Sequence, residues 1–358
     1  METGSRLVVT FLMNALWQAA LLAAMAWAAD RILRRGPASY RHAVWAAAMI
    51  GSVLLPLMSV VPRPPGPAAY VAPPPDLSVA APPAGPMAAP AAPVSPGRRS
   101  IPLAPTAAGV IAAGYAMLLL YGWLRLGASL AATQRMGAAG TGRYGDELAR
   151  AWERAREAMT PGATRLRVLP GLVSPIALHR TVIVPTWFDG GAGPEVLASA
   201  LGHELAHVAR RDFAFNLLYE ACFALVAFHP AAWLMRREIE RTREMACDEA
   251  VTRRLVEPGA YAKSILEIAT AAAATAEPRL ALGVSDGNLL GERIRRVLAR
   301  PGLGLRRPGL ALGGALAGLA IAAGAAPPGG GGAPGSPPGG PRGPGGGAPR
   351  APARAPPP

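Results

Sequence analysis

Three long apolar segments without a charged residue limit what this chain can fold into. They cover residues 7–29, 43–61 and 106–124, and about 20 apolar residues in a helix suffice to cross a bilayer. The composition agrees, because 51% of the residues are hydrophobic and only 16% are charged. A cleaved signal peptide would have a shorter apolar core and a more basic start than METGSR. We therefore expect the first segment to be retained as a membrane helix.

A fourth, weaker apolar segment of mainly Ala, Gly and Leu covers residues 309–326. Its small residues four apart allow close packing against another membrane helix, which favours this face as the route by which a signal enters. The predicted fold is mainly α-helical and multi-pass, with four transmembrane helices. The chain divides into two membrane helices with a short connection (1–61), a disordered Pro/Ala-rich loop (62–103), the third membrane helix (104–134), a soluble domain (135–305), the fourth membrane helix (306–326) and a disordered Pro/Gly-rich tail (327–358).

Arginines set the expected orientation in the membrane. Arg31, Arg34, Arg35 and Arg41 lie between the first two apolar segments, and short connections rich in arginine remain cytoplasmic. The N-terminus, the 62–103 loop and the tail are then outside, and the soluble domain is cytosolic. The net charge of +14 alone is compatible with nucleic-acid binding, but the sequence has no basic stripe with interleaved aromatic residues. We therefore expect no direct contact with nucleic acid.

The most specific motif is His203-Glu204-x-x-His207, within GPEVLASALGHELAHVARRD at residues 193–212. Positions i and i+4 of a helix lie on one face. Two imidazoles at that spacing can bind one metal ion, and the glutamate beside them is free to act on a bound water. Pro194 suits a first helical position. The sequence predicts a helix with a metal site; the alternative is two histidines on a solvated helix.

A third ligand is expected downstream, because zinc hydrolases usually have three protein ligands. Glu244 and Asp248, in RTREMACDEA, are one turn apart on one face of a predicted helix. Such a pair can supply a carboxylate ligand and an acceptor that orients a ligand histidine. A solvated Glu244 is the simpler interpretation of that residue alone. Glu238, Glu240 and Glu249 are alternatives by composition.

Glu244 has to return to the histidines, which constrains the apolar segment at residues 213–234. A helix that continued from the motif to about Phe228 would travel about 30 Å, and the chain from Pro230 to Glu244 comes back about 20 Å. We therefore predict a helical hairpin that turns at His229-Pro230 and either packs on the membrane helices or dips into the bilayer. A complete crossing would leave Glu244 on the far side. The same argument places His229 far from the metal.

The rest of the soluble domain contains short elements and two cysteines. The patterns predict an amphipathic helix at 146–159, strands at 166–169, 176–178 and 181–184, and later helices at 236–254, 261–276 and 289–300. A small sheet beside a metal-binding helix lets a peptide substrate add a strand; a purely structural sheet is the alternative. Cys222 and Cys247 make no disulfide framework. Both fall in helical patterns, so we expect them to be buried and inert.

Taken together, these pieces resemble the BlaR/MecR-type membrane metallopeptidases, the antirepressor peptidase family. The matching segments are HELAHVARRDFAFN, the FHPAAW turn, REMACDEAV and the upstream SPIALHRTVIVP. The order of membrane helices, three before the protease and one after it, also matches, so the resemblance covers about residues 7–326. HELAH alone is shared by many zinc peptidases, but its combination with RRD and EMACDEAV is fairly specific.

The resemblance implies an α+β gluzincin-type zinc metallopeptidase domain inserted between membrane helices. It places Zn²⁺ on His203, His207 and Glu244, with Glu204 as the general base and Asp248 behind the ligands. It also implies signal transduction at a bacterial-type inner (cytoplasmic) membrane, by cleavage of a cytosolic protein such as a winged-helix repressor. The best-known members carry a penicillin-binding sensor after the last membrane helix. Here only the Pro/Gly tail follows, which puts β-lactam sensing in doubt.

Two other functions stay open at this point. One is a quality-control protease of membrane proteins with the same chemistry. The other is a catalytically inactive receptor or scaffold, against which the complete H-E-x-x-H and E-x-x-x-D patterns argue. The group that would stabilise the oxyanion is also open, because no Tyr, His or Arg is distinguished by its spacing. Homo-oligomers through the membrane helices are compatible with the sequence.

Overall fold

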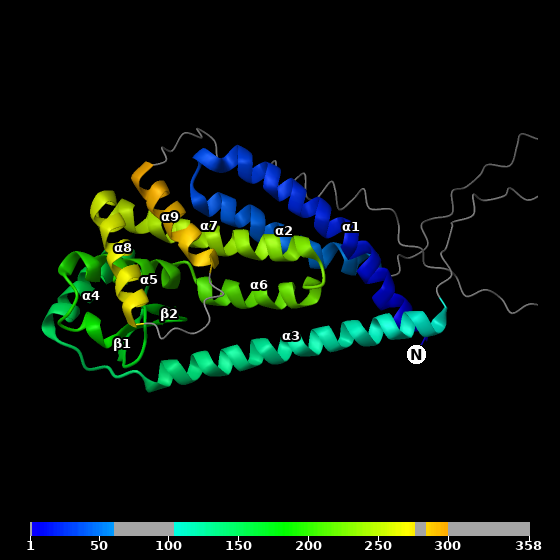
Figure 1. Cartoon of the computed structure of the whole chain (residues 1–358), viewed down its shortest axis with the longest axis horizontal. Helices are drawn as coiled ribbons and strands as arrows, with labels where there is room; N and C mark the ends of the chain where they lie inside the picture. Colours follow the sequence, from blue (N-terminus) through cyan, green and yellow to red (C-terminus); the bar gives the residue numbers. More distant parts are fainter. Residues whose placement is uncertain (1, 61–103, 276–283, 300–358) are drawn as a thin grey trace, which may run out of the picture. The chain divides into compact units, whose positions relative to one another are not determined.

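The computed structural model describes residues 2–60, 104–275 and 284–299, and within them the chain is mostly helical with one small sheet (Figure 1). The predicted loop, the fourth membrane helix and the tail lie outside the described residues. The helices and strands are α1 Glu2–Ile32, α2 Ala38–Val60, α3 Pro105–Ala139, α4 Asp146–Met159, β1 Arg165–Leu169, β2 Ile176–Leu178, β3 Thr181–Pro185, α5 Pro194–Ala209, α6 Asp212–Val226, α7 Pro230–Arg254, α8 Pro258–Thr275 and α9 Val284–Ala299.

Three of these helical segments are long and apolar enough to cross a membrane: Gly4–Arg35, Ala38–Val60 and Pro105–Ala139. They contain the first and third apolar segments seen in the sequence, and the second up to residue 60. α3 differs from the expected boundary at residue 134, because the helix continues to Ala139 and ends at Gly140, whose backbone is extended. Residues after Arg125 such as Gln134 and Arg135 are good helix formers. The helix therefore does not stop where the apolar composition stops.

A buried ion pair joins α1 to α2. Arg41 donates from Nε and Nη2 to the two carboxylate oxygens of Asp30, at 2.7 and 2.9 Å, and the indole of Trp45 donates to the same carboxylate at 3.2 Å. Both charged side chains are less than a tenth exposed. Because breaking a buried pair leaves an uncompensated charge, this contact fixes how the two helices meet.

The soluble part has its own core between α4, the sheet and α5. α4 has the bounds predicted from its periodicity, and the side chains of Leu148, Trp152, Ala155 and Met159 are all buried. The sheet has the order β1-β3-β2, with β1 parallel and β2 antiparallel to β3. Buried residues of β1, β3 and α5 complete this core. β2 is therefore an edge strand.

The motif helix does not continue to Phe228, in contrast to the continuous helix assumed from the sequence. α5 ends at Ala209, and Arg211 takes a left-handed conformation with φ 59° before α6 begins at Asp212. The predicted hairpin is confirmed. α6 and α7 are antiparallel neighbours joined at His229, whose Nδ1 accepts a hydrogen bond from the backbone N–H of Ala231 at 3.0 Å.

A glycine allows α5 and α7 to approach closely. A Cβ on Gly202 would lie 2.7 Å from Leu255 Cδ2 and 3.4 Å from Val251 Cγ1. We expect Gly202→Val to lower the free energy of unfolding by about 1–3 kcal/mol through overpacking. Gly202→Ala should cost less, because the end of the Leu255 side chain can rotate away. The measurement is thermal unfolding of the purified protein in detergent.

The control is Gly114→Ala on α3, where no atom lies within 4 Å of the added Cβ. It should leave the melting temperature unchanged or slightly raised, since alanine favours a helix over glycine by about 0.5–1 kcal/mol. A Gly202→Val protein as stable as the unsubstituted chain would contradict the close approach of the two helices.

Candidate metal centre

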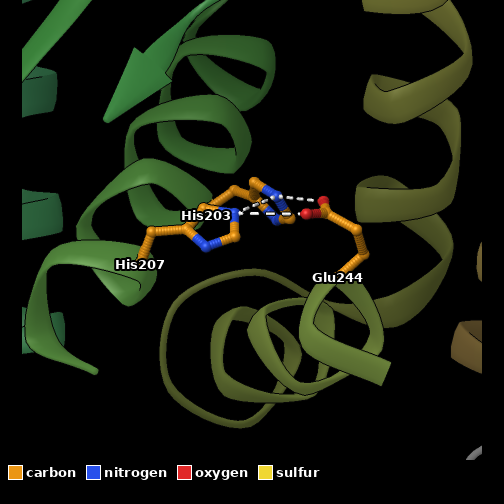
Figure 2. A group of neighbouring side chains, drawn as sticks. All are labelled: His203, His207 and Glu244. Carbon is orange, nitrogen blue, oxygen red and sulfur yellow. Dashed lines mark hydrogen bonds and ion pairs between the residues drawn. The ribbon is translucent and has the colours of Figure 1, made fainter. Parts of the chain in front are cut away.

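Two helices bring three side chains of metal-ligand type together. His203 and His207 lie one turn apart on α5, and Glu244 lies on α7. His203 Nε2 is 3.2 Å from His207 Nε2 and 3.2 Å from Glu244 Oε2, and His207 Nε2 is 3.7 Å from Glu244 Oε1. Figure 2 shows the three side chains pointing toward one another from the two helices. The structure thus places the expected third ligand beside the motif histidines.

The spacing of these atoms fits a tetrahedral metal ion. Zinc binds histidine nitrogen at about 2.0–2.1 Å, so neighbouring ligand atoms in a tetrahedron are about 3.3–3.4 Å apart. The possible ligand atoms of His203, His207 and Glu244 all lie within 4.8 Å of one another. Two imidazoles and one carboxylate are also a donor set of catalytic zinc sites, which keep a fourth position for water. The residues present therefore fit zinc.

Each histidine is oriented by a carboxylate on its outer nitrogen. Nδ1 of His207 is 2.8 Å from Asp212 Oδ2, and Nδ1 of His203 is 3.2 Å from Asp248 Oδ1. The hydroxyl of Tyr261 donates to Asp248 at 2.8 Å and lies 3.0 Å from His203 Nδ1. Such partners fix the ring orientation and direct the other nitrogen of the ring toward a metal. Asp248 therefore has the position that the sequence predicts for it.

Arg293 on α9 neutralises the buried carboxylates behind the cluster. It donates to both oxygens of Asp248, at 2.7 and 2.9 Å, and its Nη1 is 3.7 Å from Glu244. Burial raises the pKa of Asp248, but Arg293 and the hydrogen bond with His203 outweigh it and bring that pKa to about 2. The pKa of Glu244 is likewise well below its ordinary value despite burial, chiefly through His203. Both carboxylates are ionised at neutral pH.

The other acidic residues of α7 pair elsewhere. Glu238 accepts from Arg241 at 2.6 Å, and Glu240 lies 3.5 Å from Arg236. Glu249 accepts from Arg296 at 2.7 Å and from the backbone N–H of Ala38 at the start of α2. None of the three belongs to a group of possible ligands among the described residues. Of the four glutamates of α7, Glu244 is therefore the one that lies beside the two histidines.

Glu204 lines a cavity of about 590 Å³ together with both histidines and Glu244. Its side chain is on α5 beside the first ligand, and the residue is 9% exposed. β2 and the preceding Ser174-Pro175 form one border of this cavity. Apolar residues of α8 and α9 form another part: Ile265, Ile268, Ala269, Ala272 and Leu290. The cavity can therefore hold an extended chain next to a carboxylate suited to proton transfer.

Both cysteines are free and buried, as predicted. Cys247 Sγ is 3.4 Å from His207 Nδ1, and with Asp212 these residues form a second group of possible ligands within the described part of the chain. This group is less suited to a metal. Burial and the nearby Asp212 carboxylate raise the pKa of Cys247 well above its ordinary value, so the thiol is protonated in the metal-free protein.

Sequence reasoning missed Asp212, Tyr261 and Arg293. Asp212 is part of the RRD segment, but no spacing rule points to it as the partner of a histidine five positions earlier. Tyr261 and Arg293 lie far along the chain and reach the cluster only through the packing of α8 and α9. The sequence is rich in arginine, and nothing in its pattern distinguishes Arg293 from the other arginines or points to Tyr261.

The metal-free protein should lose stability as the pH rises. Burial lowers the pKa of His203, but hydrogen bonds with Asp248 and Glu244 outweigh it and raise that pKa from 6.5 to about 9. The bound proton stabilises the folded state fully below pH 6.5, and this contribution, on the order of 3 kcal/mol, is lost as the pH rises through 9. Thermal unfolding of chelator-treated protein at pH 6.5 and 9.5 measures it.

The His203→Gln variant is the control, because it has no imidazole to titrate. Its melting temperature should change less between the two pH values than that of the unsubstituted chain. An equal pH dependence in both proteins would assign the effect to other groups.

A search of curated proteins found no match. A family model described as BlaR1 peptidase M56 matches residues 10–297, which include most of the first candidate span, the other two spans, the sheet and the whole group of possible ligands. The match covers well over half of the 358 residues. The chain therefore belongs to the BlaR1 peptidase M56 family.

Proposed function

We infer that this protein is an integral membrane zinc endopeptidase that cleaves a cytosolic protein in a signalling response. The observation that carries this proposal is the cluster of His203, His207 and Glu244 in one cavity with Glu204. Family membership supports a peptidase, and the three candidate spans support a membrane protein. The regulatory role and a repressor as the substrate rest on the family resemblance of the sequence.

The residues divide the chemistry of peptide hydrolysis between them. His203, His207 and Glu244 would hold zinc, which lowers the pKa of a bound water and polarises a carbonyl. Glu204 lines the same cavity and would accept the proton of the attacking water and deliver it to the leaving amine nitrogen. With zinc bound, Asp212 and Asp248 would accept hydrogen bonds from Nδ1 of the two imidazoles and so leave Nε2 of each ring for the metal.

β2 is suited to binding the substrate as an added strand. It pairs with β3 along one side only, through Ile176, Ala177 and Leu178, and these residues line the cavity beside Glu204. Main-chain groups on the free side of an edge strand can bind an extended peptide whatever its sequence, and pockets then select side chains. The substrate segment would therefore be extended and locally unfolded.

The proposed location is the inner (cytoplasmic) membrane, with the metal centre in the cytosol. Arg31 in the last turn of α1, and Arg34 and Arg35 between α1 and α2, support this orientation through the positive-inside rule. A quality-control protease with the same chemistry is the second candidate. The apolar residues that line the cavity favour neither candidate, because an apolar lining accepts apolar side chains from either kind of substrate.

Glu204→Gln should retain zinc and abolish peptide hydrolysis, because it removes the proton acceptor and not a ligand. Glu244→Gln should weaken zinc binding as well as activity. Metal analysis of the purified variants, together with cleavage of a fluorogenic protein substrate, separates the two effects. Full zinc content and normal activity in Glu244→Gln would contradict the assignment of the third ligand.

The same inactive variant tests the regulatory role in cells. New protein N-termini that appear with the unsubstituted chain and not with Glu204→Gln identify the substrates by mass spectrometry. We expect a single dominant site in a small DNA-binding repressor. Many sites spread over misfolded membrane proteins would favour quality control instead.

The orientation has a separate test. A cysteine placed at Ala80 should react with an impermeant thiol reagent added to intact cells, and one at the exposed Arg150 on α4 should react only after lysis. Background labelling should be low, because Cys222 and Cys247 are buried. Labelling of the Arg150→Cys variant in intact cells would reverse the orientation.

A further inference from the structure

We propose that the α6–α7 hairpin is inserted in the bilayer. It enters from the side on which the metal centre lies and reaches about half-way through, with lipid acyl chains against its outer face. This inference concerns residues 220–238, which are too short to cross the membrane and lie outside the three candidate spans. It does not depend on the proposed peptidase activity.

The hairpin and the membrane helices share one core. Trp45, Met49 and Val53 of α2 form a buried cluster with residues of both arms of the hairpin, among them Phe223 and Met235. α6 also contacts α3 and lies between α2 and α3 (Figure 1). A helix that packs along the apolar middle of two membrane helices occupies the same layer of the membrane as they do.

The contacts with α3 are close. A Cβ on Gly122 would lie 3.2 Å from the Cβ of Ala224, so the two helices approach at that glycine. Tyr115 donates to the backbone carbonyl of Leu225 at 2.8 Å, and its ring centroid is 6.0 Å from that of Phe228. Gly122 and Tyr115 both lie inside the apolar part of α3, before Arg125.

His42 lies at the entry level, the level where the hairpin enters the hydrocarbon layer. It is the last polar residue before the apolar run of α2, and its ring contacts both arms. Nδ1 is 3.3 Å from the Ile239 carbonyl, and Nε2 is 3.4 Å from the Tyr219 hydroxyl. From this level the arms continue to Val226 and Pro230, about 10 and 14 Å at 1.5 Å per residue. The turn therefore lies near the middle of a hydrocarbon layer about 30 Å thick.

The composition of the hairpin fits this depth. Between residues 221 and 235 there is no Asp, Glu, Lys or Arg. Glu220 and Arg236 are the first charged residues on either side of the turn, and they form an ion pair near the entry level with Nε and Oε1 2.7 Å apart. Arg237, one residue further from the turn, is exposed, and its long side chain can extend to the membrane surface. Trp233 and Leu234 are 52% and 41% exposed on the outside of the hairpin. Exposing these apolar side chains to water costs free energy, whereas lipid acyl chains form an apolar environment for them.

Several backbone groups of the turn have hydrogen-bond partners in the protein, as a turn in lipid requires. The Val226 carbonyl accepts from the backbone N–H of His229 at 2.9 Å. The Ala227 carbonyl accepts from the indole of Trp233 at 2.8 Å, and the Leu225 carbonyl accepts from Tyr115. His229 accepts from the N–H of Ala231, and Pro230 has no N–H. A turn in water would not need three side chains for this purpose.

The inference fixes the distance of the metal centre from the membrane. Asp212, which orients His207, begins α6 seven residues before Tyr219 at the entry level. Seven helical residues correspond to about 10 Å. The cluster therefore lies just outside the hydrocarbon layer, and a substrate has to reach the membrane surface to be bound.

Spin-label accessibility in vesicles tests the insertion. Full-length protein carrying Leu234→Cys is labelled with a nitroxide, reconstituted in phosphatidylcholine–phosphatidylglycerol vesicles and exposed to oxygen or to a water-soluble nickel chelate. Leu57→Cys on α2 is the membrane reference, and Arg253→Cys, exposed near the end of α7, is the water reference. We expect the logarithm of the oxygen-to-nickel ratio to be positive at 57 and 234 and negative at 253.

A second label at Leu218→Cys, one residue before the entry level, should give an intermediate ratio, and it covers the case in which Leu234→Cys does not fold. The unsubstituted chain gives the background from its buried cysteines. Nickel accessibility at residue 234 equal to that at 253 would place the hairpin in water. Low accessibility to both reagents at 234 would mean that protein, and not lipid, covers this face. Either result overturns the proposal without bearing on peptidase activity.

Discussion

Buried and partly buried charge pairs fix the position of α7, and the geometry of the proposed metal centre depends on them. Arg293 binds Asp248 behind the ligands, and Arg296 and the start of α2 bind Glu249 one residue later. Such pairs add little net stability compared with apolar residues of the same size, but breaking one costs about 3–5 kcal/mol. They therefore act against alternative registers of the helix. A shift of α7 by one residue would unpair both carboxylates and would also turn Glu244 away from the histidines.

The same physics explains what the sequence could predict. α4, the strands and the hairpin follow from local periodicity and from Gly and Pro at their ends, so their bounds agree within one or two residues with the structure. His203, Glu204 and His207 are recognisable because a helix turns their spacing into proximity. Glu244 could be chosen among its neighbours only because the chain has to return to the motif. All of these inferences use geometry that a single helix or hairpin supplies.

The features that could not be predicted depend on contacts between distant segments or on unusual backbone. Tyr261 and Arg293 reach His203 from α8 and α9, 58 and 90 residues away along the chain. The break between α5 and α6 depends on a positive φ at Arg211, a residue type that carries no turn signal. Asp212 becomes the partner of His207 only because of that break. An uninterrupted helix would have carried its carboxylate past the ring, since residues five apart do not share a face.

α7 connects the membrane to the metal centre as one helix of 25 residues. Its first turns pack on α2 and α6, Glu244 lies in its second half, and Met245 and Glu249 contact Arg41 and the first residue of α2. A packed helix moves as a unit, and cores change between discrete arrangements and do not deform continuously. A rearrangement of α1 and α2 would therefore displace Glu244 relative to the histidines on α5. Displacements of about 1 Å can cost a catalytic site a factor of about 100. A signal carried by the membrane helices would consequently need no separate relay to control this site, because the helix that carries the proposed third ligand is itself packed against them.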